Sequence, residues 1–271
     1  MESGLYEWGN RENMTLVCLH GMGSTGLSFG ELAHYLADYH VVSFDLARNG
    51  SDKSLSEEEA YKKPSCMAEE VEKVVKVLDK SKICLVGHSW GAHLALYFAK
   101  AYPEQVQGVI LLDGGYIQQP GSDSLEEELI RMEDFHNSIR FPSWEAFIES
   151  EKREMPRWST EIEAATKAQV TEINGEIRLA LPVSDAKAIL KGIYAEPTKD
   201  VLEKIICPVL LLRSTLPEEM EGLRQQQAND FLENTPNAQV RLIPNTTHDI
   251  YRDSPGEVSR NIREWIQETA Y

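Results

Sequence analysis

The sequence is poor in cysteine and in basic residues, and it has no long apolar run. Its four cysteines form no CxxC pair and no cluster with histidine, so we expect reduced, mostly buried thiols and no metal site. No apolar stretch approaches the ~18 residues that cross a bilayer, and no positively charged, apolar leader opens the chain. We therefore expect a cytoplasmic protein that does not bind a membrane.

Acidic side chains outnumber basic ones, 44 to 27, which gives a formal net charge of -17 and an isoelectric point near 4.9. Such a surface repels the phosphates of nucleic acids and of anionic membranes. Nucleic acid is therefore excluded as an expected partner, and a small-molecule partner is favoured. A local pocket can differ from the mean, so acidic substrates stay open, and the composition does not specify an oligomeric state.

Short apolar runs alternate with helical patterns along most of the chain. The helical patterns have apolar residues at three- and four-residue steps, over 67–78, 92–99 and 258–266. Residues 4–8 are expected to add an antiparallel edge strand. The alternation predicts a doubly wound α/β fold with a mostly parallel sheet. The runs that predict its other strands are 15–19, 41–44, 83–86, 109–112, 208–212 and 238–243.

The alternation stops between residues 117 and 201, where the sequence is charged and helical. This length is too great for a structureless loop, so we expect an inserted helical cap. The core then comprises residues 1–116 and 202–271. Five aromatic residues of the insertion either line a covered site or form the cap's own core, and the second interpretation is preferred: Phe135, Phe141, Trp144, Phe147 and Trp158.

The segment GHSWG at residues 87–91 follows an apolar strand and precedes a helix. This context is typical of a nucleophile elbow, a strained turn that lifts a serine hydroxyl above the sheet and needs small residues two positions to either side. Ser89 is the predicted nucleophile. Ser89 lies at the N-terminus of the helix that follows it, where free backbone amides and the helix dipole stabilise developing negative charge. The side chain of His88 is expected to point away from Ser89.

Two further segments complete the predicted chemistry. A serine needs a base, and of the seven histidines His248 has the favoured place, directly after the last strand. The segment HGMG at residues 20–23 is a glycine-rich turn after a strand, and no GK[ST] follows it as in a phosphate loop. We expect the amides of Met22 and Trp90 to form an oxyanion hole, and His20 to have a structural role or to shape that hole.

With the segment 45–51, these motifs resemble the α/β-hydrolase superfamily, in the cap-bearing branch that holds esterases, haloalkane dehalogenases and epoxide hydrolases. Segment 45–51 is similar to the family's DxxGxGxS stretch, with Arg48 and Asn49 as departures. Haloalkane dehalogenases and epoxide hydrolases use an aspartate as the nucleophile, whereas this chain has Ser89. The resemblance therefore implies acyl transfer through a serine ester rather than alkyl transfer to a carboxylate.

The acid, the third member of the expected triad, is where this sequence differs from most of the family. Most of the family carries an aspartate shortly after the strand at 208–212, where this chain has Pro217. Glu218 follows it and could substitute. The alternative is Asp113, at the end of the preceding core strand, where dehalogenases are known to carry their acid. Asp113 is preferred, and both stay open. Asp249 is adjacent to His248 and cannot easily reach its ring.

These residues predict a serine hydrolase that cleaves a small-molecule carboxylic ester, or a related acyl compound, through an acyl-enzyme on Ser89. No metal or organic cofactor is implied. Two alternatives share the fold. One is a ligand receptor or partner-binding protein with slow or no turnover. It is favoured because Pro217 stands where most of the family has an aspartate. The other is a cofactor-free haloperoxidase or acyltransferase, which would use the same residues.

Overall fold

A computed structural model describes residues 4–46, 62–117 and 124–269 of the chain. In this part, a seven-stranded sheet has the order β1-β3-β2-β4-β5-β8-β9. All neighbours pair in parallel except β1, which lies antiparallel to β3 at the edge. The strands are β1 Leu5–Trp8, β2 Thr15–Leu19, β3 His40–Phe44, β4 Ile83–His88, β5 Val106–Leu112, β8 Val209–Arg213 and β9 Ala238–Leu242.

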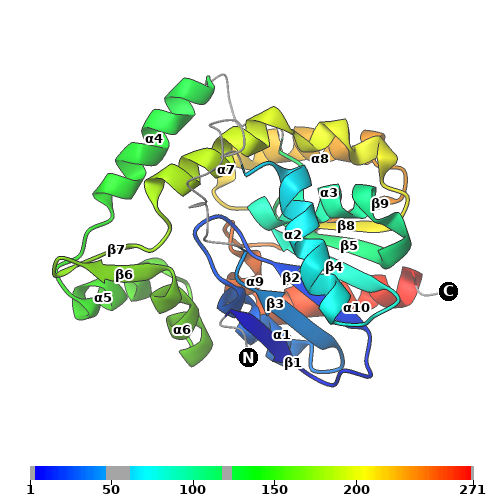
Figure 1. The fold of residues 1–271 in the computed structure, drawn as a ribbon, viewed down its shortest axis with the longest axis horizontal. Helices are drawn as coiled ribbons and strands as arrows, with labels where there is room; N and C mark the ends of the chain where they lie inside the picture. The colour runs from blue at the N-terminus through cyan, green and yellow to red at the C-terminus, as the bar shows by residue number, and fades with distance from the viewer. Residues whose placement is uncertain (1–3, 47–61, 118–123, 270–271) are drawn as a thin grey trace.

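Helices cover both faces of this sheet, as Figure 1 shows. Alternate strand residues point to opposite faces, so each strand contributes to two apolar cores. In β5, Val109 and Leu111 pack with α2, α3 and α8, whereas Ile110 and Leu112 pack with α1, α9 and α10. The doubly wound α/β prediction is confirmed. The helices are α1 Gly30–Tyr35, α2 Pro64–Val77, α3 Trp90–Ala101, α8 Glu221–Asn234, α9 Ile250–Asp253 and α10 Pro255–Thr269.

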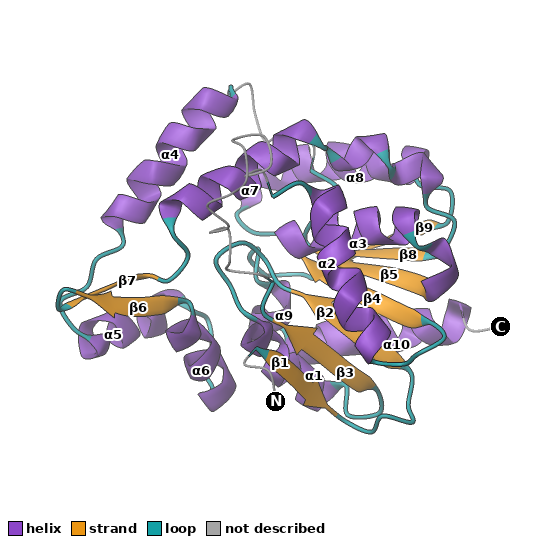
Figure 2. Ribbon diagram, in the orientation of Figure 1, coloured by secondary structure: helices purple, strands orange, loops and turns teal. Residues whose placement is uncertain are grey.

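Between β5 and β8 the chain leaves the sheet and builds a separate group of elements beside it (Figure 2). Helix α7 packs against α4, and Phe147, Val170 and Ile177 form a small core of their own. The sequence predicted only helices here, but two strands pair in an antiparallel hairpin. The elements are α4 Leu125–Ser138, α5 Trp144–Glu154, α6 Thr160–Ala168, β6 Val170–Ile173, β7 Glu176–Leu179 and α7 Val183–Ala195.

The parallel order brings the carboxyl ends of β2, β4, β5 and β8 to one edge of the sheet. Loops that follow these ends are where open α/β sheets place their ligands. Ser89 follows β4, Asp113 follows β5, and the glycine-rich turn follows β2. The fold therefore gathers residues that are far apart in the sequence, and it does so on rigid strand ends.

Candidate active site

Ser89 occupies a strained backbone position between β4 and α3. Its φ of 52° and ψ of −117° lie in a region that residues other than glycine rarely adopt. Two hydrogen bonds fix the turn: the Ser89 amide donates to the Leu112 carbonyl at 3.3 Å, and the Ala92 amide donates to the Ser89 carbonyl at 3.0 Å. Strain held in this way is the geometry expected of a nucleophile elbow.

Glycines flank this turn because the backbone of neighbouring elements leaves no room for a side chain. A Cβ on Gly91 would lie 2.0 Å from the carbonyl oxygen of Leu19, and one on Gly87 would lie 2.5 Å from that of Gly91. A Cβ on Gly114 would lie 2.6 Å from the Ser89 carbonyl oxygen. The close packing of β2, β4, α3 and the end of β5 thus explains why small residues are required here.

His248 follows β9 and its ring contacts Asp113, which follows β5. The Nδ1 atom of His248 lies 2.9 Å from Oδ2 of Asp113. The Asp113 carboxylate is buried, whereas the His248 side chain is 55% exposed. An ionised carboxylate only accepts hydrogen bonds, so this contact places the proton on Nδ1 and leaves Nε2 as the basic nitrogen.

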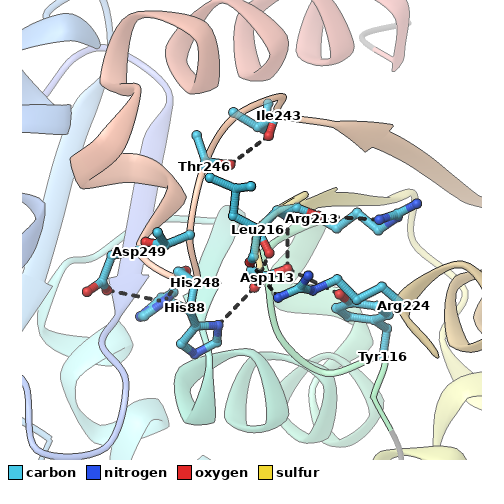
Figure 3. A network of polar contacts seen from close by, with 12 residues as sticks. His88, Asp113, Tyr116, Arg213, Leu216, Arg224, Ile243, Thr246, His248 and Asp249 are labelled. Atoms are coloured by element: carbon cyan, nitrogen blue, oxygen red, sulfur yellow. Dashed lines mark hydrogen bonds and ion pairs between the residues drawn. The ribbon is translucent and has the colours of Figure 1, made fainter. Parts of the chain in front are cut away.

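Three more donors hold the Asp113 carboxylate, which Figure 3 shows between His248 and Tyr116. The amide of Ser214 donates to Oδ1 at 2.9 Å, its hydroxyl donates to Oδ2 at 2.9 Å, and the hydroxyl of Tyr116 donates to Oδ1 at 3.2 Å. Burial alone would raise the pKa of Asp113, but these bonds and the contact with His248 outweigh it, and the pKa is lowered. Asp113 therefore stays ionised at neutral pH.

The same contact acts on His248 in the opposite sense. Partial removal of water from this half-exposed ring would lower the pKa of its imidazole, but the hydrogen bond and the negative charge of Asp113 outweigh that effect and raise the pKa above its ordinary value. The charged form of the ring is thus stabilised. This is the property that a general base needs when it takes a proton from a serine.

The other candidate acid lies elsewhere. Glu218 begins the short 3-10 helix Glu218–Met220 and is exposed, and none of its contacts within the described residues is with His248. Oδ1 of Asp249 lies 3.6 Å from Nε2 of His88. The geometry thus selects Asp113 as the partner of His248.

The loop after β8, where most of the family would carry the acid, supports Asp113 instead. Ser214 supplies two of the donors described above. Buried Arg224 donates to the carbonyl oxygens of Leu216 and Pro217, and the Leu216 amide donates to the Thr246 carbonyl beside the His248 loop. This loop therefore joins the two segments that carry Asp113 and His248.

Two backbone amides next to Ser89 are available for an oxyanion. Trp90 is the first residue of α3, where an amide has no intrahelical acceptor, and Met22 lies in the loop after β2. Among the described residues neither amide donates a hydrogen bond. Both residues line one cavity with Ser89 and His248.

His20 holds the peptide that contains the Met22 amide. Its Nε2 accepts from the Leu46 amide at 3.0 Å, so its Nδ1 carries the proton and donates to the Gly21 carbonyl at 2.8 Å. In a trans peptide the carbonyl and the next N–H point in opposite directions. The bond therefore directs the Met22 N–H away from His20, which gives the predicted hole-shaping role a physical basis.

The cavity at this edge has a volume of about 270 Å³. Core residues line it together with Leu190, Ile193 and Tyr194 of α7 in the insertion. None of the five aromatic residues singled out in the insertion lines it. Phe147 and Phe141 belong to the small core around β6 and β7, while Trp144 and Phe135 are exposed.

Two histidines near the site acquire a meaning that the sequence did not reveal. His88 is buried and donates from Nε2 to the carbonyl oxygen of His248 at 3.0 Å. The centroid of its ring lies 4.8 Å from that of His248, and the two rings are tilted by 44°. Burial and the neighbouring His248 lower its pKa to about 4. The other is His93 on α3, which lines the cavity. In the sequence, the one signal for this position of His93 is its spacing of four residues from Ser89, which places both on the same side of the helix.

No group of metal-ligating side chains occurs in the ranges 4–46, 62–117 and 124–269. Within these same ranges, no helix has the length and apolar character needed to cross a membrane. The segment at 45–51 lies outside the described residues from position 47 onward, so its departures Arg48 and Asn49 have no structural account.

A sequence model of the Alpha/beta hydrolase family matches residues 16–261. "Serine hydrolase-like protein" from Danio rerio is 32% identical over 107 residues, which is 39% of this chain and 32% of that protein, so the match spans about a third of that relative. "Epoxide hydrolase 3" from Xenopus tropicalis is 24% identical over 96% of this chain and 73% of its own. A solved thermophilic esterase from Thermogutta terrifontis shares 23% identity and a TM-score of 0.69, over 98% and 93% of the two chains.

Proposed function

Since the chain belongs to the Alpha/beta hydrolase family, we propose that it is a serine hydrolase that cleaves a small carboxylic ester or a related acyl compound. The observation that carries the proposal is the 2.9 Å contact between His248 and buried Asp113, beside a cavity that Ser89 and His248 both line. Serine, histidine and carboxylate in this relation are the groups required for acyl transfer.

In the proposed reaction, Nε2 of His248 takes the proton of the Ser89 hydroxyl while the oxygen attacks the substrate carbonyl. Asp113 stabilises the imidazolium that forms, and the amides of Met22 and Trp90 donate to the oxyanion. The imidazolium then gives its proton to the leaving alcohol, and an acyl-enzyme remains on Ser89. Water, deprotonated by His248, releases the acid and restores the serine.

A serine nucleophile separates this chain from the chemistry of epoxide hydrolases, despite its similarity to one of them. Those enzymes, as the sequence resemblance implies, attack with a carboxylate, whereas the residue at this elbow is Ser89. Two named relatives, a serine hydrolase-like protein and an esterase, agree with the acyl-transfer interpretation. We also propose that residues 117–201 act as a cap, with α7 limiting the size of the substrate.

The receptor alternative loses its main support. It depended on the missing aspartate near Pro217, and Asp113 provides a carboxylate at His248 from another strand end. An acyltransferase would differ only in the acceptor that resolves the acyl-enzyme. No observation on the described residues favours a bulky second acceptor, because the cavity of about 270 Å³ is small.

The test is steady-state hydrolysis of short-chain p-nitrophenyl esters. We expect multiple turnovers by the wild type, and a loss of kcat on the order of 10⁴-fold or more in Ser89→Ala. Ser259→Ala is the matched control, because that serine is buried on α10 at the other face of the sheet and bonds only to the Gly256 carbonyl. A single turnover by the wild type would favour the receptor, and equal rates in wild type and Ser89→Ala would refute the proposal.

A further inference from the structure

His93 belongs to the helix that begins directly after Ser89. Residues four apart lie on the same face of a helix, and His93 is four residues after the serine. Its side chain lines the same cavity as Ser89, Trp90 and His248. A group on the substrate could therefore contact this ring while the carbonyl lies at the serine.

The imidazole of His93 has no protein partner within the described ranges. The ring takes part in no hydrogen bond or ion pair with a described residue. Its Nδ1 atom is buried and unbonded, whereas Nε2 keeps accessible surface and is the nitrogen that a ligand in the cavity can reach. A buried polar atom without a partner is destabilising, and most buried polar atoms in native proteins are hydrogen-bonded. The other histidines at this edge, His20, His88 and His248, each bond through at least one ring nitrogen, although Nδ1 of His88 is also buried and unbonded.

The ring of His93 is neutral at neutral pH. Burial lowers its pKa to about 4, with no charged neighbour contributing. A neutral imidazole has one nitrogen that donates and one that accepts. A hydroxyl group, which can also donate and accept, is the simplest complement of such a ring.

The rest of the cavity limits the substrate's size and charge. Its wall is mostly apolar, with Met22, Ile117, Leu190 and Ile193 among the lining residues. Two carboxylates, those of Glu128 and Asp113, are also in the lining, and both are engaged by protein donors. A mostly apolar wall of this kind favours an uncharged ligand. The volume of about 270 Å³ suits a small molecule.

We propose that His93 is a specificity-determining residue that binds a hydroxyl group on a small, uncharged ester substrate. The proposal rests on the proposed hydrolase function for the position of the scissile carbonyl. It goes beyond that function because it names a chemical group of the substrate. A site built to bond a hydroxyl discriminates against the analogue that lacks it, since the buried polar group is then left unpaired.

The experiment compares three matched esters: ethyl butyrate, ethyl 3-hydroxybutyrate and 2-hydroxyethyl butyrate. Their dissociation constants are measured by tryptophan fluorescence in the Ser89→Ala background, where Trp90 lines the cavity and no turnover occurs. The same series is measured with His93→Leu and with His93→Gln added to that background. Glutamine keeps a donor and an acceptor, whereas leucine has neither.

We expect at least one hydroxylated ester to bind about tenfold tighter than ethyl butyrate, with the preference lost in His93→Leu and partly kept in His93→Gln. The proposal is overturned if neither hydroxylated ester is preferred, or if the preference persists in His93→Leu. It is also overturned if monoethyl succinate, which carries a carboxylate, binds tighter than both. Because binding is measured without turnover, failure of the hydrolase function would appear separately, as absence of ester hydrolysis by the wild type.

Discussion

At the scale of single residues, Asp113 receives four hydrogen bonds, from His248, from Tyr116 and twice from Ser214. A carboxylate that accepts several bonds stays ionised and cannot turn. Its left-handed backbone, with φ of 45°, places it at the end of β5 facing the His248 loop. The orientation and the tautomer of His248 therefore depend on Asp113.

Replacing this carboxylate tests that dependence. In Asp113→Asn, the amide cannot hold the proton on Nδ1 of His248 in the same way, and we expect kcat for ester hydrolysis to fall by about 10²–10⁴-fold. Glu218→Gln is the matched control, because Glu218 is exposed and the described contacts of His248 do not include it. Full activity in Asp113→Asn, with a large loss in Glu218→Gln, would reverse the assignment.

The raised pKa of His248 has a defined consequence for the dependence on pH. A general base must be neutral, and its positive form is stabilised by Asp113, so kcat/KM should rise with pH through a value above about 6.5. Imidazole NMR should show His248 titrating there, and at lower pH in Asp113→Asn. His88 and His93 provide the internal comparison, since the pKa of each is about 4. Titration of His248 below about 6.5 in the wild type would contradict this explanation.

At the scale of elements, the site depends on how closely β2, β4 and α3 approach one another. The Ser89 turn is strained, and it persists because Gly91 lets the first turn of α3 lie against the Leu19 carbonyl. Strain of this kind is maintained only where the surrounding packing determines it. Folding stability and the position of the nucleophile are therefore coupled at this junction.

A pair of glycine substitutions separates this packing from helix propensity. Gly91→Ala places a Cβ 2.0 Å from the Leu19 carbonyl oxygen, and we expect it to lower the free energy of unfolding by about 3 kcal/mol or more. Gly222→Ala, in α8, meets no atom within 4 Å and should raise stability by about 0.5–1 kcal/mol. Urea denaturation measures both, and equal effects would show that the close approach is unimportant.

The elements differ in how well the sequence predicts them. The central strands are buried on both faces, so they appear as continuous apolar runs, and edge strand β1 was also predicted correctly. Hairpin β6–β7 was missed because each strand has only four residues, and β6 is exposed at three of its four positions and shows no apolar alternation. Its signal was the Asn174-Gly175 pair, where both residues have positive φ, as the tight turn of a hairpin requires.

At the scale of the whole molecule, the candidate site is made by distant segments that no local pattern connects. Asp113 and His248 are 135 positions apart, and Ser214, which supports Asp113, belongs to a third strand end. The sequence indicated both candidate acids, but only the tertiary arrangement distinguishes them. The sequence did not indicate that residues of α7 line the cavity, whereas the aromatic residues of the insertion do not line it, in agreement with the preferred interpretation.

The insertion is tied to the core by contacts on opposite sides. Arg157, between α5 and α6, forms a bidentate pair with Glu31 of α1 at 2.6 and 2.8 Å and donates to the Arg252 carbonyl. At the other side, Glu196, just after α7, accepts from the amide and hydroxyl of Ser65 at the start of α2. The Glu196 link lies next to α7, which lines the cavity, so it supports the proposed role of the insertion in holding the substrate.

The central claim is that Ser89 is an activated nucleophile, and covalent labelling tests it most directly. The wild-type protein is exposed to a fluorophosphonate, and its intact mass is then compared with that of Ser89→Ala treated in the same way. The account predicts one adduct on the wild type, located by peptide mapping on Ser89, and none on the variant. An unlabelled wild type, or equal labelling of the two proteins, would contradict it.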